Sequence, residues 1–105
     1  MPKNVFVSLP MTGKTEEQMW EDFFERCSEY IRDHAGEETY FHCNIGVKED
    51  DIRDISCKPG LESLAYLSIA LQQMAKCDEV IFHKDWEKSK GCKVEKLIYE
   101  LYFEK

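Results

Sequence analysis

Short apolar runs alternate along this chain with longer stretches in which apolar residues recur at a helical period. The runs are rich in β-branched and aromatic residues, as is typical of strands, and lie at residues 4–9 (NVFVSL), 39–45 (TYFHCNI) and 79–82 (EVIF). Amphipathic helices are predicted after Thr15 and before Gly36, from Leu61 to Lys76, and from Val94 nearly to Lys105. The pattern therefore predicts three strands and three helices in strict alternation.

Each predicted helix has a recognisable apolar face. Thr15 and Gln18 have the spacing of a capping box, which marks the start of the first helix. Its apolar positions are Met19, Trp20, Phe23, Phe24, Cys27, Tyr30 and Ile31. The second helix has Leu64, Leu67, Leu71 and Met74, widened by alanines, so we expect it to be heavily buried; the third has Val94, Leu97, Ile98, Leu101 and Tyr102. Residues 46–60 show no period and are expected to be irregular and to face solvent.

The β-α-β-α-β-α order predicts a parallel sheet with helices on both faces. We expect one domain over residues 1–105: a small doubly wound three-layer α/β/α domain of Rossmann or flavodoxin type, with strand order 2-1-3. Such sheets bind ligands at the carboxyl ends of their strands. The loops at residues 8–15 (SLPMTGKT) and 83–91 (HKDWEKSKG) should therefore meet at that edge and form the site.

Composition narrows the choice of ligand. The formal net charge is -7, so the chain has no basic field for a nucleic acid polymer or an anionic membrane, although a helix N-terminus can still bind a small anion. Five dispersed cysteines and three isolated histidines favour a reducing compartment and no metal site. The apolar runs are short and the start is unlike a signal peptide, so we expect a cytoplasmic protein without a membrane segment. No cofactor is expected.

The segment SLPMTGKT ends like a phosphate-binding P-loop, but its first half does not fit one. Ser8 occupies the position of the opening glycine, and Pro10 lacks the N–H group that an anion nest requires. The acidic residue needed to organise Mg²⁺ is also misplaced, because Asp85 follows the third strand only after a histidine and a lysine. We therefore do not expect a nucleoside triphosphate site.

Taken together, the two loops resemble those of the nucleoside 2-deoxyribosyltransferase superfamily, in particular a short bacterial and phage branch. The family's first strand and loop are similar to I-Y-I-S-G-P-M-T-G, and residues 5–13 read VFVSLPMTG. The branch has a second pattern similar to C-D-x-V-x-x-x-x-x-W-E-x-S-x-G-x-x-x-E, which residues 77–95 reproduce. The resemblance covers most of the chain except residues 35–58.

The resemblance implies an enzyme that cleaves or transfers N-glycosidic bonds of a small-molecule nucleoside or nucleotide. It assigns the nucleophile to Glu95, in the first turn of the last predicted helix, where the macrodipole favours an ionised carboxylate. Asp85 is the candidate general acid. Trp86 is expected to stack on the base, and the sugar or a 5'-phosphate is expected to contact the two loops at Ser8, Pro10, Met11, Thr12, Gly13, Ser89 and Gly91. With a base as acceptor the enzyme is a transferase, and with water it is a hydrolase.

Some features leave alternatives open. Acidic residues favour helix starts whatever their role, aspartate is a common turn residue, and Ser89 is also a natural N-cap. The family's tyrosine in the first strand is Phe6 here, and the glycine before the proline is Leu9, which narrows the loop. The alternative is a catalytically silent nucleotide- or metabolite-binding module of the same fold. The resemblance also implies a homodimer or a higher homo-oligomer.

Overall fold

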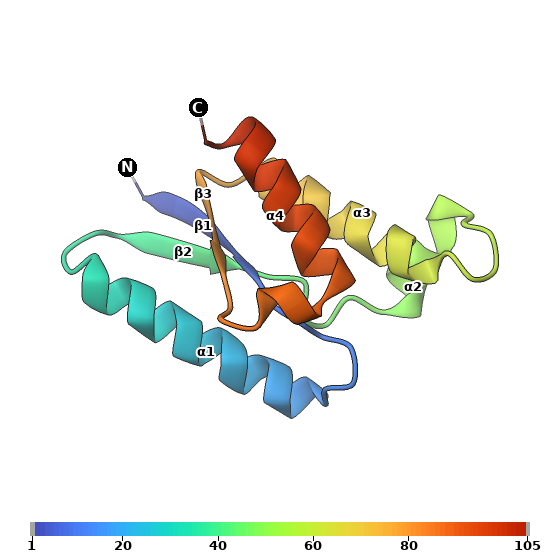
Figure 1. The fold of residues 1–105 in the computed structure, drawn as a ribbon, viewed down its shortest axis with the longest axis horizontal. Coiled ribbons are helices and arrows are strands. Elements are labelled where there is room, and N and C mark those ends of the chain that lie inside the picture. Colours follow the sequence, from blue (N-terminus) through green and yellow to red (C-terminus); the bar gives the residue numbers. More distant parts are fainter. Residues whose placement is uncertain (1, 105) are drawn as a thin grey trace.

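The computed structural model describes residues 2–104 and contains a three-stranded parallel sheet in the order β2-β1-β3. The strands are β1 (Lys3–Ser8), β2 (Thr39–His42) and β3 (Glu79–Phe82). β1 pairs with both neighbours, and its last residue, Ser8, lies opposite Phe82 of β3. The predicted fold class, a small α/β domain with helices on both faces of a 2-1-3 sheet, is confirmed (Figure 1).

Helices cover the two faces of the sheet unequally. α1 (Glu16–Asp33) lies along one face, and α3 (Glu62–Met74) and α4 (Lys90–Tyr102) lie along the other (Figure 1). The strand residues alternate between these faces: Val5, Val7 and Leu9 pack with Phe23, Cys27 and Tyr30 of α1, whereas Phe6 and Val80 pack with Ala70 and Met74 of α3. The central strand therefore contributes to two separate apolar clusters.

The capping signals in the sequence are present in the structure. The Thr15 hydroxyl accepts a hydrogen bond from the Gln18 backbone N–H at 3.1 Å, and the Gln18 side chain accepts one from the Thr15 N–H at 2.9 Å. Ser89 caps α4, because its hydroxyl accepts from the Cys92 backbone N–H at 3.3 Å. Both helices therefore begin where their side chains satisfy free backbone donors.

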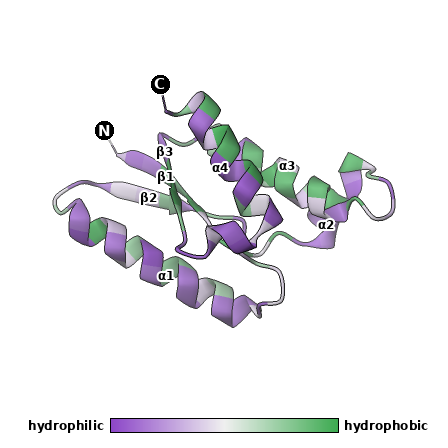
Figure 2. Ribbon diagram, in the orientation of Figure 1, coloured by the Kyte–Doolittle hydropathy of each residue, from purple (hydrophilic) through white to green (hydrophobic). Residues whose placement is uncertain are grey.

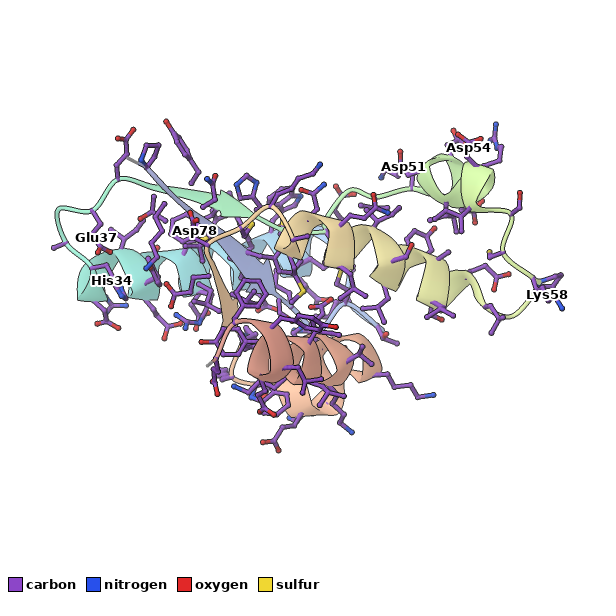
Figure 3. The ribbon with its side chains drawn as sticks, turned by 90° about the horizontal axis from the view of Figure 1, so that it is seen from above. His34, Glu37, Asp51, Asp54, Lys58 and Asp78 are labelled. Carbon is purple, nitrogen blue, oxygen red and sulfur yellow. The ribbon has the colours of Figure 1, made fainter. Side chains whose placement is uncertain are left out.

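The region between β2 and α3 differs from its prediction as an irregular segment. It holds a short helix, α2 (Glu49–Ile52), and a 3₁₀ turn, η1 (Arg53–Ile55), and Ile52 is buried. In Figure 3, Asp51, Asp54 and Lys58 lie at one end of the molecule, while His34 and Glu37 lie at the other. The second strand also ends at His42 and not at residue 45, so Asn44 belongs to the loop that follows it.

The apolar helix faces are wider than the surface that the sheet can cover. The prediction of a heavily buried second helix is wrong, because only Ala65, Ala70 and Met74 of α3 are buried, although Figure 2 shows most of this helix as hydrophobic. On α4 the buried positions are Cys92 and Glu95. Several apolar side chains of these two helices are instead exposed, namely Leu64, Val94, Leu97, Leu101 and Tyr102. No helix within residues 2–104 is long and apolar enough to cross a membrane.

Candidate active site

A buried hydrogen bond joins the end of β1 to α4. The Ser8 hydroxyl donates to Oε1 of Glu95 at 2.5 Å, and the two residues are 1% and 7% exposed. The sequence predicted Glu95 in the first turn of the last helix. Because α4 begins at Lys90, Glu95 lies in the second turn instead. The helix dipole therefore stabilises the carboxylate less than predicted, and Ser8 is its main polar contact.

The surroundings of Glu95 keep its carboxyl group partly protonated at neutral pH. Burial raises the pKa of Glu95 from 4.5 to about 7, because a charge is costly where water is excluded, and the hydrogen bond from Ser8 lowers it and offsets part of this effect. No residue between positions 2 and 104 hydrogen bonds to the other carboxyl oxygen, Oε2. Glu95 therefore has one oxygen that is held in place and one without a protein partner.

Glu95 lies in the wall of a cleft with a volume of about 980 Å³. The cleft is bounded by the loop after β1, the segment after β2, the first half of α3 and the start of α4. Among the residues predicted to bind substrate, those lining it are Met11, Thr12, Ser89 and Gly91. Ser8 does not line it but bonds to Glu95 from beneath, and Pro10 and Gly13 belong to the same loop without facing the cleft.

Phe6 and Leu9, the two residues that differ from the loop pattern expected from the sequence, both line the cleft. Leu9 also packs in the core cluster with Val7 and Phe23 of α1. Phe6 is buried against Ala70 and Met74 and supplies an apolar part of the lining. Phe6 has no hydroxyl group, and Ser8 is the donor that contacts Glu95.

Asp85 and Trp86 lie outside the cleft lining. Asp85 Oδ1 is 3.5 Å from Lys88 Nζ, and its backbone N–H donates to Nδ1 of His83 at 3.1 Å. Trp86 packs near Phe82, with ring centroids 6.2 Å apart, and the Lys96 ammonium lies over the Trp86 ring at 5.7 Å. The structure thus places Trp86 in a cation–π cluster on the outer side of β3 and not beside Glu95.

The two loops after β1 and β3 do meet, as predicted. The His83 backbone N–H donates to the Ser8 carbonyl at 3.1 Å, which extends the pairing of the two strands to the edge of the site. Lys14, the lysine of the Gly-Lys-Thr segment, forms an ion pair with Asp22 of α1, and Asp22 also lies 3.7 Å from the buried imidazole of His83. The Lys14 ammonium group is therefore paired within the protein and is not placed as the lysine of a P-loop would be.

Sequence reasoning missed several cleft residues. Asn44 and Ile45 lie where the strand was predicted to continue, and Val47 lies in the segment predicted to be irregular; all three line the cleft. Lys48 and Glu16 also line it, with 3.7 Å between Lys48 Nζ and Glu16 Oε2. The signal for Asn44 was its place near the carboxyl end of a parallel strand. Tyr66 and Leu67 of α3 had no such signal, because Leu67 was predicted only as part of an apolar helix face and Tyr66 was not singled out.

The potential metal ligands and the cysteines are distributed as follows. Within residues 2–104 no three histidine, cysteine, aspartate or glutamate side chains are grouped to hold a metal ion. All five cysteines are free thiols, and burial raises the pKa of Cys92, the cysteine that lines the cleft. That thiol is therefore kept neutral beside Glu95.

A family comparison covers almost all of the chain. A family model described as "Domain of unknown function (DUF4406)" matches residues 3–102. The chain belongs to the DUF4406 family. No curated protein and no solved structure matches it.

Proposed function

We propose that the protein cleaves or transfers the N-glycosidic bond of a nucleoside or nucleotide, with Glu95 as the nucleophile. The observation that carries this proposal is the buried Ser8–Glu95 pair in the wall of a large cleft. A carboxylate that only caps or solubilises a helix is normally exposed, because burying a charge is costly. A glutamate whose pKa is raised to about 7 in a cleft is typical of a functional group.

The chemistry follows from the two carboxyl oxygens. The free oxygen attacks the anomeric carbon, a carbon–oxygen bond forms, and the bond to the base breaks with its electron pair leaving on the base nitrogen. The departing base takes up a proton from the solvent, and the water or base that attacks in the second step gives one back. Water or a second base then displaces the sugar from Glu95, giving hydrolysis or transfer, respectively. Ser8 donates to the other oxygen throughout and fixes the orientation of the carboxylate.

The remaining cleft residues suit a nucleoside or its 5'-monophosphate. The walls are largely apolar, with Met11, Met19 and Leu67 available to contact a planar base. Lys90 is the first residue of α4, where free backbone N–H groups and its ammonium group favour an anion despite the acidic net charge. Lys88, just before the helix, also lines the cleft, and its ammonium group lies 3.5 Å from Asp85 Oδ1. Asp85 was the candidate general acid, but it lies outside the cleft lining. Glu16 is the second carboxylate, besides Glu95, that lines the cleft.

Two further expectations belong to this proposal. A homo-oligomer is supported by the exposed apolar side chains of α4, with Leu97 54% and Leu101 66% exposed. A cytoplasmic location is supported by five free thiols. The alternative, a silent nucleotide-binding module, is supported by the absence of a second polar partner for Glu95 within residues 2–104.

A panel of ribo- and deoxyribonucleosides and their 5'-monophosphates, incubated with and without free acceptor bases, tests the proposal. Chromatography should show base release or base exchange by the unaltered protein, and Glu95→Gln should reduce the rate by at least about a thousandfold because the nucleophile is lost. Glu100→Gln, an exposed change on the same helix, is the matched control and should be fully active. Saturable binding without turnover in the unaltered protein would favour the silent module, and the absence of both would reject both functions.

A further inference from the structure

One buried polar atom in the cleft wall has no partner. Asn44 donates from Nδ2 to the Tyr66 carbonyl at 3.2 Å, and this contact sets which way the carboxamide points. Its Oδ1 is buried and accepts no hydrogen bond. Within residues 2–104 it is the one buried side-chain nitrogen or oxygen left without a partner. Folded proteins rarely leave such an acceptor unsatisfied unless it serves a function or binds something absent from the structure.

Asn44 follows β2 on the side of the sheet that carries the Ser8–Glu95 pair. β1 and β2 are paired up to Phe6 and His42, so two further residues along each chain would bring Ser8 level with Asn44. Their side chains also point to the same face, because Phe41, Cys43 and Ile45 pack against the α1-side cluster, whereas Asn44 contacts α3 and Ser8 contacts α4. Asn44 and Glu95 both line the same cleft, so one ligand can contact both residues.

We infer that Asn44 is a specificity-determining residue whose Oδ1 accepts a hydrogen bond from a hydroxyl or amino group of the ligand. This inference rests on the proposed function. A ligand bound with its anomeric carbon at Glu95 places sugar hydroxyls and the edge of the base within a few ångströms of that carbon. Because Oδ1 is buried, the ligand donor reaches it only when neighbouring side chains move aside.

An orphan acceptor kept for a ligand has a specific consequence for stability. Replacing Asn44 by leucine removes an unsatisfied buried acceptor. It also removes the hydrogen bond to the Tyr66 carbonyl, but that carbonyl lies within α3 and remains part of the helix. The variant should therefore melt no lower than the unaltered protein. The chain's other asparagine, Asn4, is the matched control, because its Oδ1 already contacts Nε2 of His42 at 3.0 Å and it lies outside the cleft.

The test measures binding and melting together. In a Glu95→Gln background, which prevents turnover, calorimetry would compare adenosine and cytidine 5'-monophosphate with analogues that lack the base amino group, the 2'-hydroxyl or the 3'-hydroxyl. We expect one missing donor to weaken binding about tenfold or more, Asn44→Leu to abolish that difference, and Asn44→Asp, which keeps an acceptor, to preserve it. Asn4→Leu should leave binding unchanged and lower the melting temperature. The analogue that loses affinity identifies the donor as base or sugar.

Two outcomes would overturn the inference, and they separate it from the function. The first outcome is that the protein turns over substrates but binds every donor-deficient analogue as well as the parent nucleotide, or that Asn44→Leu binds normally and melts as low as Asn4→Leu. In either case Asn44 is a structural residue, and the proposed function stands. If the unaltered protein neither binds nor cleaves any member of the panel, the proposed function fails and the inference fails with it.

Discussion

The hydroxyl of Ser8 donates a 2.5 Å hydrogen bond to Glu95, a residue 87 positions later in the chain. The contact joins the carboxyl end of the central strand to the helix that follows the third strand. It is buried, and it leaves the second oxygen of Glu95 without a partner within residues 2–104. A carboxylate positioned in this way can act on a ligand in the cleft, and it also makes the stability of the fold depend on pH.

Replacing Glu95 by glutamine should stabilise the protein at alkaline pH. The folded protein holds the Glu95 proton up to a pKa of about 7, whereas the unfolded chain releases it near 4.5. Between these values the folded state binds more protons, so its stability falls as the pH rises through this window, by about 3 kcal/mol in total. Urea denaturation should therefore show Glu95→Gln about 3 kcal/mol more stable than the unaltered protein at pH 8 and nearly equal to it at pH 4.

The exposed change Glu100→Gln is the control for this comparison and should alter the free energy of unfolding by less than about 0.5 kcal/mol at both pH values. A stability difference between Glu95→Gln and the unaltered protein that is the same at pH 4 and pH 8 would contradict the raised pKa.

Removing the Ser8 hydroxyl should raise the pKa of Glu95 further. This hydrogen bond favours the ionised carboxylate, so Ser8→Ala shifts the carboxyl titration, followed by ¹³C NMR, to higher pH. Activity at pH 7 should fall about tenfold and recover in part on raising the pH. Ser68→Ala removes a serine hydroxyl that bonds only to the Ala65 carbonyl within α3, and it should leave both the titration and the activity unchanged. An unshifted titration in Ser8→Ala would show that Ser8 does not control this group.

The Lys14–Asp22 ion pair should contribute to stability and not to triphosphate binding. A double-mutant cycle with Lys14→Met and Asp22→Asn is expected to give a coupling energy of about 1 kcal/mol, because both side chains are partly buried. The more exposed pair Lys88–Asp85 should give a coupling near zero. Saturable binding of magnesium and adenosine triphosphate that Lys14→Met abolishes would instead revive the P-loop interpretation.

The exposed face of α4 should control assembly. Leu97 and Leu101 are more than half exposed, and Tyr102 is 71% exposed, so introducing lysine at Leu97 and Leu101 together should convert a homo-oligomer into a monomer in sedimentation velocity. Ile31→Lys alters an equally exposed apolar residue on the opposite side of the sheet and should leave the oligomer intact. Sedimentation of the unaltered protein as a monomer at tens of micromolar concentration would count against this assembly.

Local patterns were sufficient to predict the elements and their order. β-Branched runs mark the three strands, Thr15 and Gln18 mark the start of α1, and the alternation of strands and helices implies a parallel sheet. The meeting of the loops after β1 and β3 followed from that topology, because parallel strands bring their carboxyl ends to one edge. Motif spacing identified Glu95 as a site residue, but it did not predict that Glu95 lies in the second turn of α4.

The tertiary structure decided which of these residues share one environment. A helical period identifies apolar positions but does not say how much sheet there is to cover them, and this three-stranded sheet leaves Leu64 and Leu97 exposed. Loop motifs likewise do not fix side-chain direction, so Trp86 turned toward Phe82 and Lys96. Asn44 became a candidate only when its unpartnered Oδ1 and its place in the cleft lining were known. The sequence by itself determined the elements and the edge of the sheet that carries the site, because these depend on local pattern. Packing between distant segments decided which side chains reach the cleft.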